Sequence, residues 1–429
     1  MITTEELYTL YKKHPEICTD TRKARPGSIF FALRGEQFDG NAFAEKALEA
    51  GCAYAVVDDP ALEKKERFIF VDDSLEVLQA LAFFHRKKFQ IPFIAITGTN
   101  GKTTTKELIY TVLASSFRTQ ATQGNLNNHI GVPLTILGIK PDTEMAIIEM
   151  GANHPGEIEA LCNIARPTHG IITNIGKAHL EGFGGYEGVI KTKKELYNFI
   201  ENKGGFIFLN SDDKLLTEIS ESIYFRIFYG QQRSSQCHVI PLTADPFAAV
   251  KWNFLKSELT IQTSLVGSYN YPNIAAAICV GDYFGIQPDI IKSSLEAYIP
   301  KNNRSEIQKT ERNTLIMDAY NANPSSMNAA LDSFSTSQFK NKIAILGDML
   351  ELGSESEKEH QQILEKAIEL NFGKLYLVGP VFSSISKSGT SFQNASEALD
   401  YFTKNKISES TILLKGSRGI GLEKIVEAL

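Results

Sequence analysis

The chain has 429 residues, of which 43% are hydrophobic and 22% charged, and its formal net charge is −6 at pH 7. A chain of this length exceeds what one hydrophobic core supports, so two or three domains are expected. The acidic balance disfavours a general nucleic-acid or membrane-surface binder, but it allows a local basic pocket for an anionic substrate.

The cysteines and the first residues bear on the cellular compartment. The five cysteines are scattered and never spaced as C-x-x-C, so the sequence predicts neither a disulfide framework nor a zinc site. The opening MITTEEL is polar and acidic, unlike a signal peptide, and no apolar run reaches the length of a membrane span. We therefore expect a cytoplasmic protein.

The first ninety residues have the pattern of a small α/β domain. Short apolar runs typical of strands alternate with segments of helical spacing. The expected strands cover residues 27–33, 53–57 and 67–71, and the expected helices residues 41–48 and 75–89. Pro92 interrupts the chain after the second helix, so we place the first domain at residues 1–90.

Two further α/β units follow, in which buried apolar runs alternate with helical stretches. This alternation is typical of mostly parallel, doubly wound sheets. The expected strands are residues 91–97, 145–149, 170–173 and 205–209, then 315–318, 342–347, 374–379 and 411–415. Helices at residues 325–334 and 357–370 make the last unit a second Rossmann-like domain. We place the central domain at residues 91–299 and the C-terminal domain at residues 300–429.

The sequence TGTNGKTTT at residues 97–105 joins an apolar strand to a helix. Glycines let the N–H groups of such a turn point at phosphates, and the helix adds the positive end of its dipole. Lys102 can reach the outer phosphates, and the Thr103 hydroxyl can bind magnesium. A standard P-loop has four residues between its glycines, whereas Gly98 and Gly101 are closer. The expected phosphate-binding residues are Gly98, Thr99, Asn100, Gly101, Lys102, Thr103 and Thr104.

Polar residues just beyond strand ends are the best candidates for ligand contacts in open α/β sheets. Glu149 closes an apolar run, and we expect its carboxylate near the phosphate loop rather than in a surface ion pair. His179 lies in a glycine-rich turn after the strand at residues 170–173. Residues 189–197 have the pattern of a lysine-rich helix, and spacing alone does not choose among its lysines or exclude a solvated basic face.

The third domain offers a similar strand end. Asn323 and Pro324 start a helix, and capping explains both without a ligand. Capping does not explain Asp318 and Tyr320 as readily. Arg304 lies at the junction of the second and third domains, where it is either a phosphate contact or an ordinary linker arginine. Two further glycine-bearing turns could face the same cleft, at residues 347–353 and 415–418.

Together these motifs resemble the Mur ligases, the ATP-dependent amide ligases of peptidoglycan synthesis. The resemblance covers nearly the whole chain and is closest to the members that add a terminal D-alanyl-D-alanine dipeptide. The Asp-Asn-Pro-Arg motif of the diaminopimelate-adding members is absent, and Ala319 stands where serine is frequent. The matching motifs are TDTR at residues 19–22, GNLNNHIGVP at 124–133, EMGANHPGE at 149–157, AHLEGF at 178–183, DAYNANP at 318–324 and LGDMLELG at 346–353.

The resemblance implies a role for each matching residue. Thr103 and Glu149 would bind one magnesium ion and His179 a second. Lys193, four residues before Tyr197, would be carbamylated and so become an anionic oxygen ligand suited to magnesium. The implied catalytic residues are Lys102, His179, Lys193 and Arg304. The implied ATP contacts outside the loop are Asn270, Asn273, Arg304 and Asp318. The implied substrate contacts are Thr21, Arg22, Asn127 and Asn128 toward the UDP-muramoyl end, and Tyr320, Asn321 and Asn323 toward the dipeptide.

The implied reaction joins D-alanyl-D-alanine to UDP-N-acetylmuramoyl-tripeptide through an acyl phosphate, using ATP and two Mg²⁺ ions. Its nucleotide groups would lie on two domains and its nucleotide-sugar end on the first, so we predict hinge closure near residues 90 and 300. We expect a monomer with no nucleic-acid partner and no membrane span.

Three alternatives remain open from the sequence. The first is another amide ligase of this superfamily, such as a different Mur ligase or a folylpolyglutamate-type enzyme. The second is a small-molecule P-loop kinase, which would release a phosphorylated product and form no amide. The third is a nucleotide-binding regulator without activity.

Overall fold

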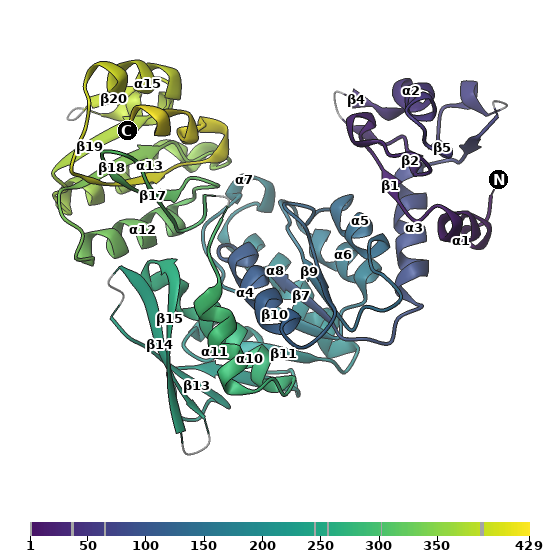
Figure 1. Ribbon diagram of the computed structural model, residues 1–429, viewed down its shortest axis with the longest axis horizontal. Helices are drawn as coiled ribbons and strands as arrows, with labels where there is room; N and C mark the ends of the chain where they lie inside the picture. The colour runs from purple at the N-terminus through teal and green to yellow at the C-terminus, as the bar shows by residue number, and fades with distance from the viewer. Residues whose placement is uncertain are drawn as a thin grey trace.

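The structure is a computed structural model that describes residues 2–35, 38–63, 66–243, 246–254, 257–301, 303–386 and 390–429. Three α/β lobes follow one another along the chain (Figure 1). The purple N-terminal lobe and the yellow C-terminal lobe lie on opposite sides of the view, with the blue-to-green central lobe between and below them.

The N-terminal lobe is built on a four-stranded parallel sheet in the order β1-β2-β5-β6, with a small antiparallel pair, β3 and β4, beside it. The strands are β1 (Ile17–Cys18), β2 (Ile29–Phe31), β3 (Arg34–Gly35), β4 (Phe38–Asp39), β5 (Tyr54–Val57) and β6 (Phe68–Phe70). The helices are α1 (Thr4–Lys13), α2 (Ala44–Glu49) and α3 (Ser74–Arg86). Asp73 caps α3 by accepting from two backbone N–H groups of its first turn, which fixes where that helix begins.

The central lobe has a nine-stranded sheet in the order β15-β14-β13-β12-β11-β10-β7-β9-β8. The strands are β7 (Phe93–Thr97), β8 (Thr119–Ala121), β9 (Met145–Glu149), β10 (His169–Ile172), β11 (Phe206–Asn210), β12 (Arg226–Gly230), β13 (Cys237–Pro241), β14 (Phe247–Phe254) and β15 (Ser257–Val266). The helices are α4 (Lys102–Ala114), α5 (Gly131–Leu137), α6 (Glu157–Ala165), α7 (Leu180–Phe183), α8 (Tyr186–Asn202), α9 (Lys214–Ile219), α10 (Tyr271–Tyr283) and α11 (Pro288–Ala297).

The central sheet is mostly parallel, as the sequence predicts, but it ends in an antiparallel part. Strands β8 to β13 pair in parallel, whereas β14 pairs antiparallel with both β13 and β15. We did not predict this hairpin. Its signal is present in β15, where Leu259, Ile261, Thr263 and Leu265 alternate with polar residues and the odd positions are the more buried.

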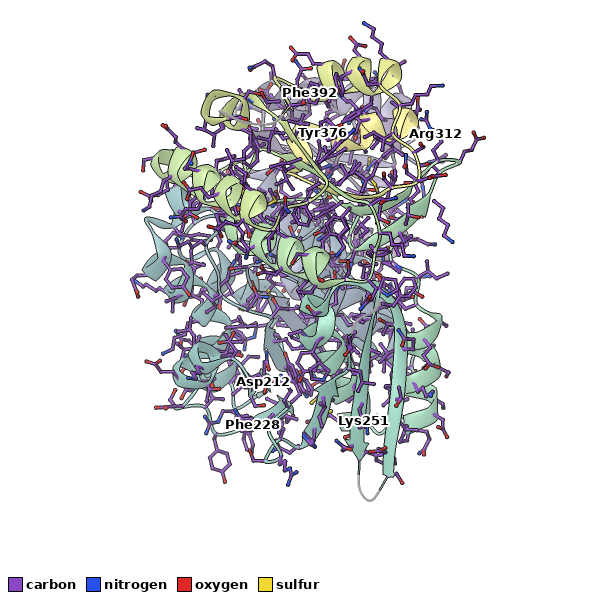
Figure 2. The ribbon with its side chains drawn as sticks, turned by 90° about the vertical axis from the view of Figure 1, so that its left-hand side faces the viewer. Asp212, Phe228, Lys251, Arg312, Tyr376 and Phe392 are labelled. Carbon is purple, nitrogen blue, oxygen red and sulfur yellow. The ribbon has the colours of Figure 1, made fainter. Side chains whose placement is uncertain are left out.

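The C-terminal lobe carries a six-stranded sheet in the order β16-β17-β21-β18-β19-β20, parallel except for β16. The strands are β16 (Glu306–Lys309), β17 (Thr314–Asp318), β18 (Lys342–Gly347), β19 (Lys374–Val378), β20 (Thr390–Phe392) and β21 (Thr411–Lys415), and the helices are α12 (Pro324–Thr336), α13 (Ser356–Glu369), α14 (Pro380–Ile385) and α15 (Ala395–Lys404). Figure 2 shows this lobe, with Tyr376 and Phe392 labelled, above the central lobe that carries Asp212 and Lys251.

The sheets bring the polar strand ends together. Strands β7, β9 and β10 are neighbours, and the phosphate loop, Glu149 and the turn that holds His179 follow their carboxyl ends. Strand β17 and its neighbour β21 end at Asp318 and Lys415 in the third lobe. Because ligands of open α/β sheets bind at such ends, this topology places one site between the second and third lobes.

Candidate functional site between the second and third domains

A cavity of about 1050 Å³ lies between the central and C-terminal domains. Most of the residues that the sequence singled out line it: Thr99, Asn100, Gly101, Lys102, Thr103, Thr104, Asn127, Asn128, Glu149, His179, Asn270, Asn273, Arg304, Asp318, Tyr320, Asn321 and Asn323. Gly98, Lys193, Thr21 and Arg22 are not among the lining residues. The cavity therefore joins candidates that are more than 200 residues apart in the chain.

The phosphate loop has the backbone that its glycines permit. Gly98 and Gly101 have φ values of +138° and +76°, which side chains rarely adopt. A Cβ on Gly98 would lie 2.1 Å from Thr173 Oγ1, so the close packing of the loop on β10 also requires glycine. Lys102 Nζ donates to the carbonyls of Gly98 and Thr99 at 2.8 and 3.0 Å, which holds the amine over the loop. Burial lowers the pKa of Lys102, although the Glu149 carboxylate opposes that shift.

Glu149 is the buried carboxylate of the cavity. Its side chain closes β9, and the residue is 1% exposed. One oxygen, Oε1, accepts from the Thr103 hydroxyl at 3.1 Å and from the Asn127 amide at 2.8 Å. The other, Oε2, is buried without a hydrogen-bond partner. A buried carboxylate oxygen without a partner is costly, so its environment suits a cation that is bound together with a nucleotide.

The donor set at this position fits magnesium better than a transition metal. No group of three or more His, Cys, Asp or Glu side chains that could hold a metal occurs within the described part of the chain. Magnesium is commonly bound by one or two carboxylates together with substrate phosphates and water. Glu149 and Thr103 match that pattern, because they offer one carboxylate and one hydroxyl beside the phosphate loop.

Lys193 lies on α8 and does not line the cavity. The residue is 3% exposed, and its Nζ is 5.3 Å from the centre of the Phe183 ring. Burial, with a smaller contribution from the nearby Lys102 charge, lowers the pKa of Lys193 to about 7. A large fraction of this amine is therefore neutral near pH 7, unlike that of an ordinary lysine.

His179 lies at the start of α7, where it meets a residue of the third domain. Its Nδ1 is 2.7 Å from Oε2 of Glu351, in the turn after β18. The hydrogen bond from His179 lowers the pKa of the Glu351 carboxyl. Glu351 lines the cavity but was not a predicted site residue. Its signal was the polar, glycine-bearing turn at residues 347–353, which the sequence pattern placed near the cleft.

The C-terminal wall carries two cationic groups. Lys415 Nζ forms a 2.9 Å ion pair with Asp318 at the ends of adjacent strands, and it also donates to the Asn321 carbonyl at 3.2 Å. The guanidinium carbon of Arg304 lies 3.6 Å from the centre of the Tyr320 ring. Within the described residues Arg304 makes no ion pair, so its charge faces the cavity without a protein counter-ion. The sequence placed the turn that begins at Lys415 near the cleft but gave Lys415 no role.

Several residues that were predicted to contact ATP or substrate use their side chains in hydrogen bonds within the protein. Asn273 accepts from Thr105 and donates to Asn270, which joins the helix after the phosphate loop to α10. Asn128 accepts from the backbone at the start of α5, and Asn321 accepts from the next backbone N–H. The hydrogen bonds of Asn323 cap α12 and reach the Asn100 amide.

Thr21 and Arg22 lie in a short 3₁₀ turn of the first lobe and do not line this cavity. The Arg22 guanidinium pairs with Asp20 at 2.7 Å, and its side chain is 86% exposed. All five cysteines are buried and free. None of the described helices has the length and apolar character that crossing a membrane requires.

Comparisons with known proteins identify the family. Three family models match in chain order: "Mur ligase family, catalytic domain" at residues 15–86, "Mur ligase middle domain" at 96–281, and "Mur ligase, glutamate ligase domain" at 303–418. UDP-N-acetylmuramoyl-tripeptide--D-alanyl-D-alanine ligase of Bacillus subtilis is 35% identical, and the alignment covers 96% of this chain and 92% of that protein.

Two solved structures have the same three-domain fold. A crystal structure of MurF from Acinetobacter baumannii matches with a TM-score of 0.88 and 29% identity, over 99% of this chain and 98% of that one. The MurF ligase from Thermotoga maritima in complex with ADP matches with a TM-score of 0.84 and 26% identity, over 96% of both chains. With its three domains matched in order and its relatives aligned over nearly their full length, this chain belongs to the Mur ligase family.

Proposed function

We propose that this chain is an ATP-dependent, ADP-forming amide ligase that joins D-alanyl-D-alanine to UDP-N-acetylmuramoyl-tripeptide in peptidoglycan precursor synthesis. The substrate assignment is carried by the similarity, over 96% of the chain, to a relative named for this reaction. The chemistry is supported by the cavity, where a phosphate loop, a buried carboxylate and the charge of Arg304 meet across two domains.

The reaction would proceed through an activated carboxylate, because a free carboxylate is a poor acyl donor to an amine. An oxygen of the tripeptide carboxylate attacks the γ-phosphorus of ATP, the bond from that phosphorus to the bridging oxygen breaks, and ADP leaves. The neutral amine of the dipeptide then attacks the acyl carbon. The tetrahedral intermediate loses a proton and expels phosphate, which leaves the amide.

The residues of the cavity suit this first step, in which two anions must approach each other. Lys102 lies within the phosphate loop, and exchange of its carbonyl contacts for phosphate oxygens would place its charge on the transferred group. Arg304 adds a second cation from the opposite domain. Charges that are already in place when phosphoryl transfer begins stabilise its transition state.

We propose that Thr103 and Glu149 hold one magnesium ion, and that His179 and a carbamylated Lys193 hold a second. The unpartnered oxygen of Glu149 supports the first position. When bound, magnesium would neutralise charge between the phosphates and the attacking carboxylate. Carbamylation joins the neutral Lys193 amine to carbon dioxide and releases a proton. Burial of Lys193 favours the neutral amine that this reaction needs.

The three domains would divide the substrates. We assign UDP-N-acetylmuramoyl-tripeptide binding to residues 1–90, with Thr21 and Arg22 among its contacts, ATP binding to residues 91–299 and completion of the site to residues 300–429. Gly98, Thr99, Asn100, Gly101 and Thr104 would bind phosphate, while Asn270, Asn273 and Asp318 would bind the nucleoside. Asn127, Asn128, Tyr320, Asn321 and Asn323 would be further substrate contacts. We further propose that the enzyme acts as a monomer and that the reaction takes place in the cytoplasm.

The test is phosphate release from ATP with purified substrates. UDP-N-acetylmuramoyl-tripeptide plus D-alanyl-D-alanine should stimulate release, whereas single amino acids or folate in place of the dipeptide should not. Mass spectrometry of the product should find the pentapeptide amide and no phosphorylated end product. Failure of the dipeptide to stimulate release would refute the substrate assignment, and a stable phosphorylated product would favour a kinase.

A further inference from the structure

His179 and Glu351 meet across the boundary between two domains. The 2.7 Å contact joins the imidazole Nδ1 to a carboxylate oxygen. Both residues have left-handed backbone conformations, with φ values of +50° and +66°. Such conformations are uncommon for side-chain-bearing residues and persist where the surrounding structure holds them. The backbone is therefore strained on both sides of this one contact.

The turn that presents Glu351 is held by hydrogen bonds from three directions. Met349 N donates to His360 Nε2 at 2.9 Å, and Leu350 N donates to Ser417 Oγ at 3.0 Å. Asp348, which is 1% exposed, accepts from two backbone N–H groups at the start of α14. A Cβ on Gly379 would lie 2.3 Å from the carboxyl carbon of Asp348, so that packing requires glycine. This support fixes the backbone that carries Glu351.

The contact determines which imidazole nitrogen is free. A histidine that donates its Nδ1–H to a carboxylate keeps the lone pair on Nε2, and metal-binding histidines are commonly held by such a partner. His179 lines the cavity on the central domain, whereas its carboxylate partner comes from the C-terminal domain. The free nitrogen and the orientation of the ring thus depend on the third domain being docked.

We propose that Glu351 is a positioning residue that orients His179 for a divalent cation, so that this cation position is complete only when the C-terminal domain closes. The inference rests on the proposed function, because a nucleotide-bound cation at His179 is part of it. The two domains would then bind ATP and cation together. An open enzyme would hold its nucleotide without the second cation and would not start phosphoryl transfer.

A neighbouring ion pair provides a matched control. Glu355 Oε2 lies 2.9 Å from Lys358 Nζ, within the C-terminal domain and four residues after Glu351. Neither residue lines the cavity. Glu351→Gln and Glu355→Gln therefore remove the same charge from the same region of the C-terminal domain, but only Glu351→Gln acts on His179.

The experiment measures Mn²⁺ binding to the full chain by electron paramagnetic resonance, with saturating ADP and Mn²⁺ in place of Mg²⁺. We expect Glu351→Gln to weaken one Mn²⁺ site about 10- to 100-fold, the usual effect of losing a partner of a metal-binding histidine. Glu355→Gln should stay within about twofold of the unaltered chain. Glu351→Asp should recover part of the affinity, because the carboxylate is retained. In the phosphate-release assay, the half-saturating Mg²⁺ concentration should rise for Glu351→Gln while the KM for the dipeptide stays constant.

Two results separate the failure of this inference from that of the proposed function. Equal Mn²⁺ affinity for both glutamine variants would overturn the positioning role of Glu351, and dipeptide-dependent phosphate release by the unaltered chain would still stand. Absence of that release would overturn the proposed function, while a Mn²⁺ loss confined to Glu351→Gln would still show that Glu351 acts through His179. The melting temperatures of both variants verify that each is folded.

Discussion

The central domain meets its two neighbours through different chemistry. At the boundary with the N-terminal domain, one apolar core runs without interruption from Leu7 and Leu81 to Ile158 of the central domain. Polar groups there are buried anchors: Arg86 donates to the Ala165 carbonyl at 2.7 Å, and a ring nitrogen of His85 lies 2.9 Å from the Ile139 carbonyl. Opening this boundary would expose apolar surface and unpaired carbonyls to water.

The boundary with the C-terminal domain is largely polar around the cavity. Lys177 pairs with Glu359, and the Asn100 amide exchanges hydrogen bonds with Asn323 and Ser325 at 2.8 and 3.0 Å. Apolar contact is found where the chain passes from the central to the C-terminal domain, because Val266 packs into the core of the C-terminal domain. Polar contacts exchange with water at low cost, whereas apolar burial does not. The comparison therefore favours a hinge near residue 300 over the one that the sequence also predicted near residue 90.

The variant with the largest expected effect lowers turnover and leaves both domain boundaries intact. Lys193→Ala removes the proposed carbamate, and we expect turnover to fall on the order of 10³-fold or more, as loss of several kcal/mol of charge stabilisation implies. ADP binding, measured by calorimetry, should remain within a few-fold because the phosphate loop is unchanged. Lys191→Ala, on the exposed face of the same helix, is the control. Near-normal turnover of Lys193→Ala would contradict the carbamate assignment.

The next effect tests the apolar boundary. Leu81 is fully buried on α3 within the shared core, so Leu81→Ala should lower the free energy of unfolding by about 2–5 kcal/mol. Denaturant unfolding measures this. Leu75→Ala makes the same truncation at a partly buried position of that helix and should cost less. If the two variants lost equal stability, the buried core would not be what fixes the first domain to the second.

The sequence predicted the elements near the site better than those at the edges of the sheets. The strands expected at residues 145–149, 342–347 and 411–415 have those bounds in the structure. Each is a short continuous apolar run, the pattern of a strand buried on both faces. The strands β12, β13 and β16 were not predicted. Strand β16 lies at a sheet edge, whereas β12 and β13 lie inside the central sheet, but all three mix polar with apolar residues, so their pattern is weaker.

The site was predictable where chemistry depends on a local motif. The phosphate loop and Glu149 follow strand ends in the sequence and meet in the cavity. The sequence placed the turns that carry Glu351 and Lys415 near the cleft but gave neither residue a role, because their roles depend on how the third domain docks and on which strands are neighbours. The hydrogen bond from Asn323 to Asn100 could not be predicted for the same reason, because it joins two domains and no sequence spacing connects them.

A smaller expected effect is the pH dependence of carbamate formation on the buried Lys193. The pKa of Lys193 is about 7 in the protein without metal, so about half of its amine is neutral at pH 7, about one tenth at pH 6 and about nine tenths at pH 8. Only the neutral amine attacks carbon dioxide, so carbamate formation in metal-free protein should rise with pH across this range. Carbon-13 spectra with labelled bicarbonate measure it, and Lys193→Ala should lose the signal. A carbamate signal independent of pH between 6 and 8 would contradict the assignment.

The smallest expected effect tests the polar boundary. Ser325 Oγ accepts from the Asn100 amide of the phosphate loop, so Ser325→Ala removes one hydrogen bond between the domains. One such bond contributes about 0.5–1.5 kcal/mol, which should weaken ADP binding about two- to tenfold if binding requires closure. The melting temperature should change little, because the bond is not part of either domain's core.

Ser335→Ala is the matched control for this last variant, since the Ser335 hydroxyl donates to Asp332 within the same helix. It should leave ADP affinity unchanged. Weaker ADP binding by Ser325→Ala alone, with an unchanged melting temperature, would locate the moving boundary between the second and third domains. Unchanged ADP affinity in both variants would mean that nucleotide binding does not depend on this contact, and the hinge would then have to be sought at the apolar boundary despite its buried core.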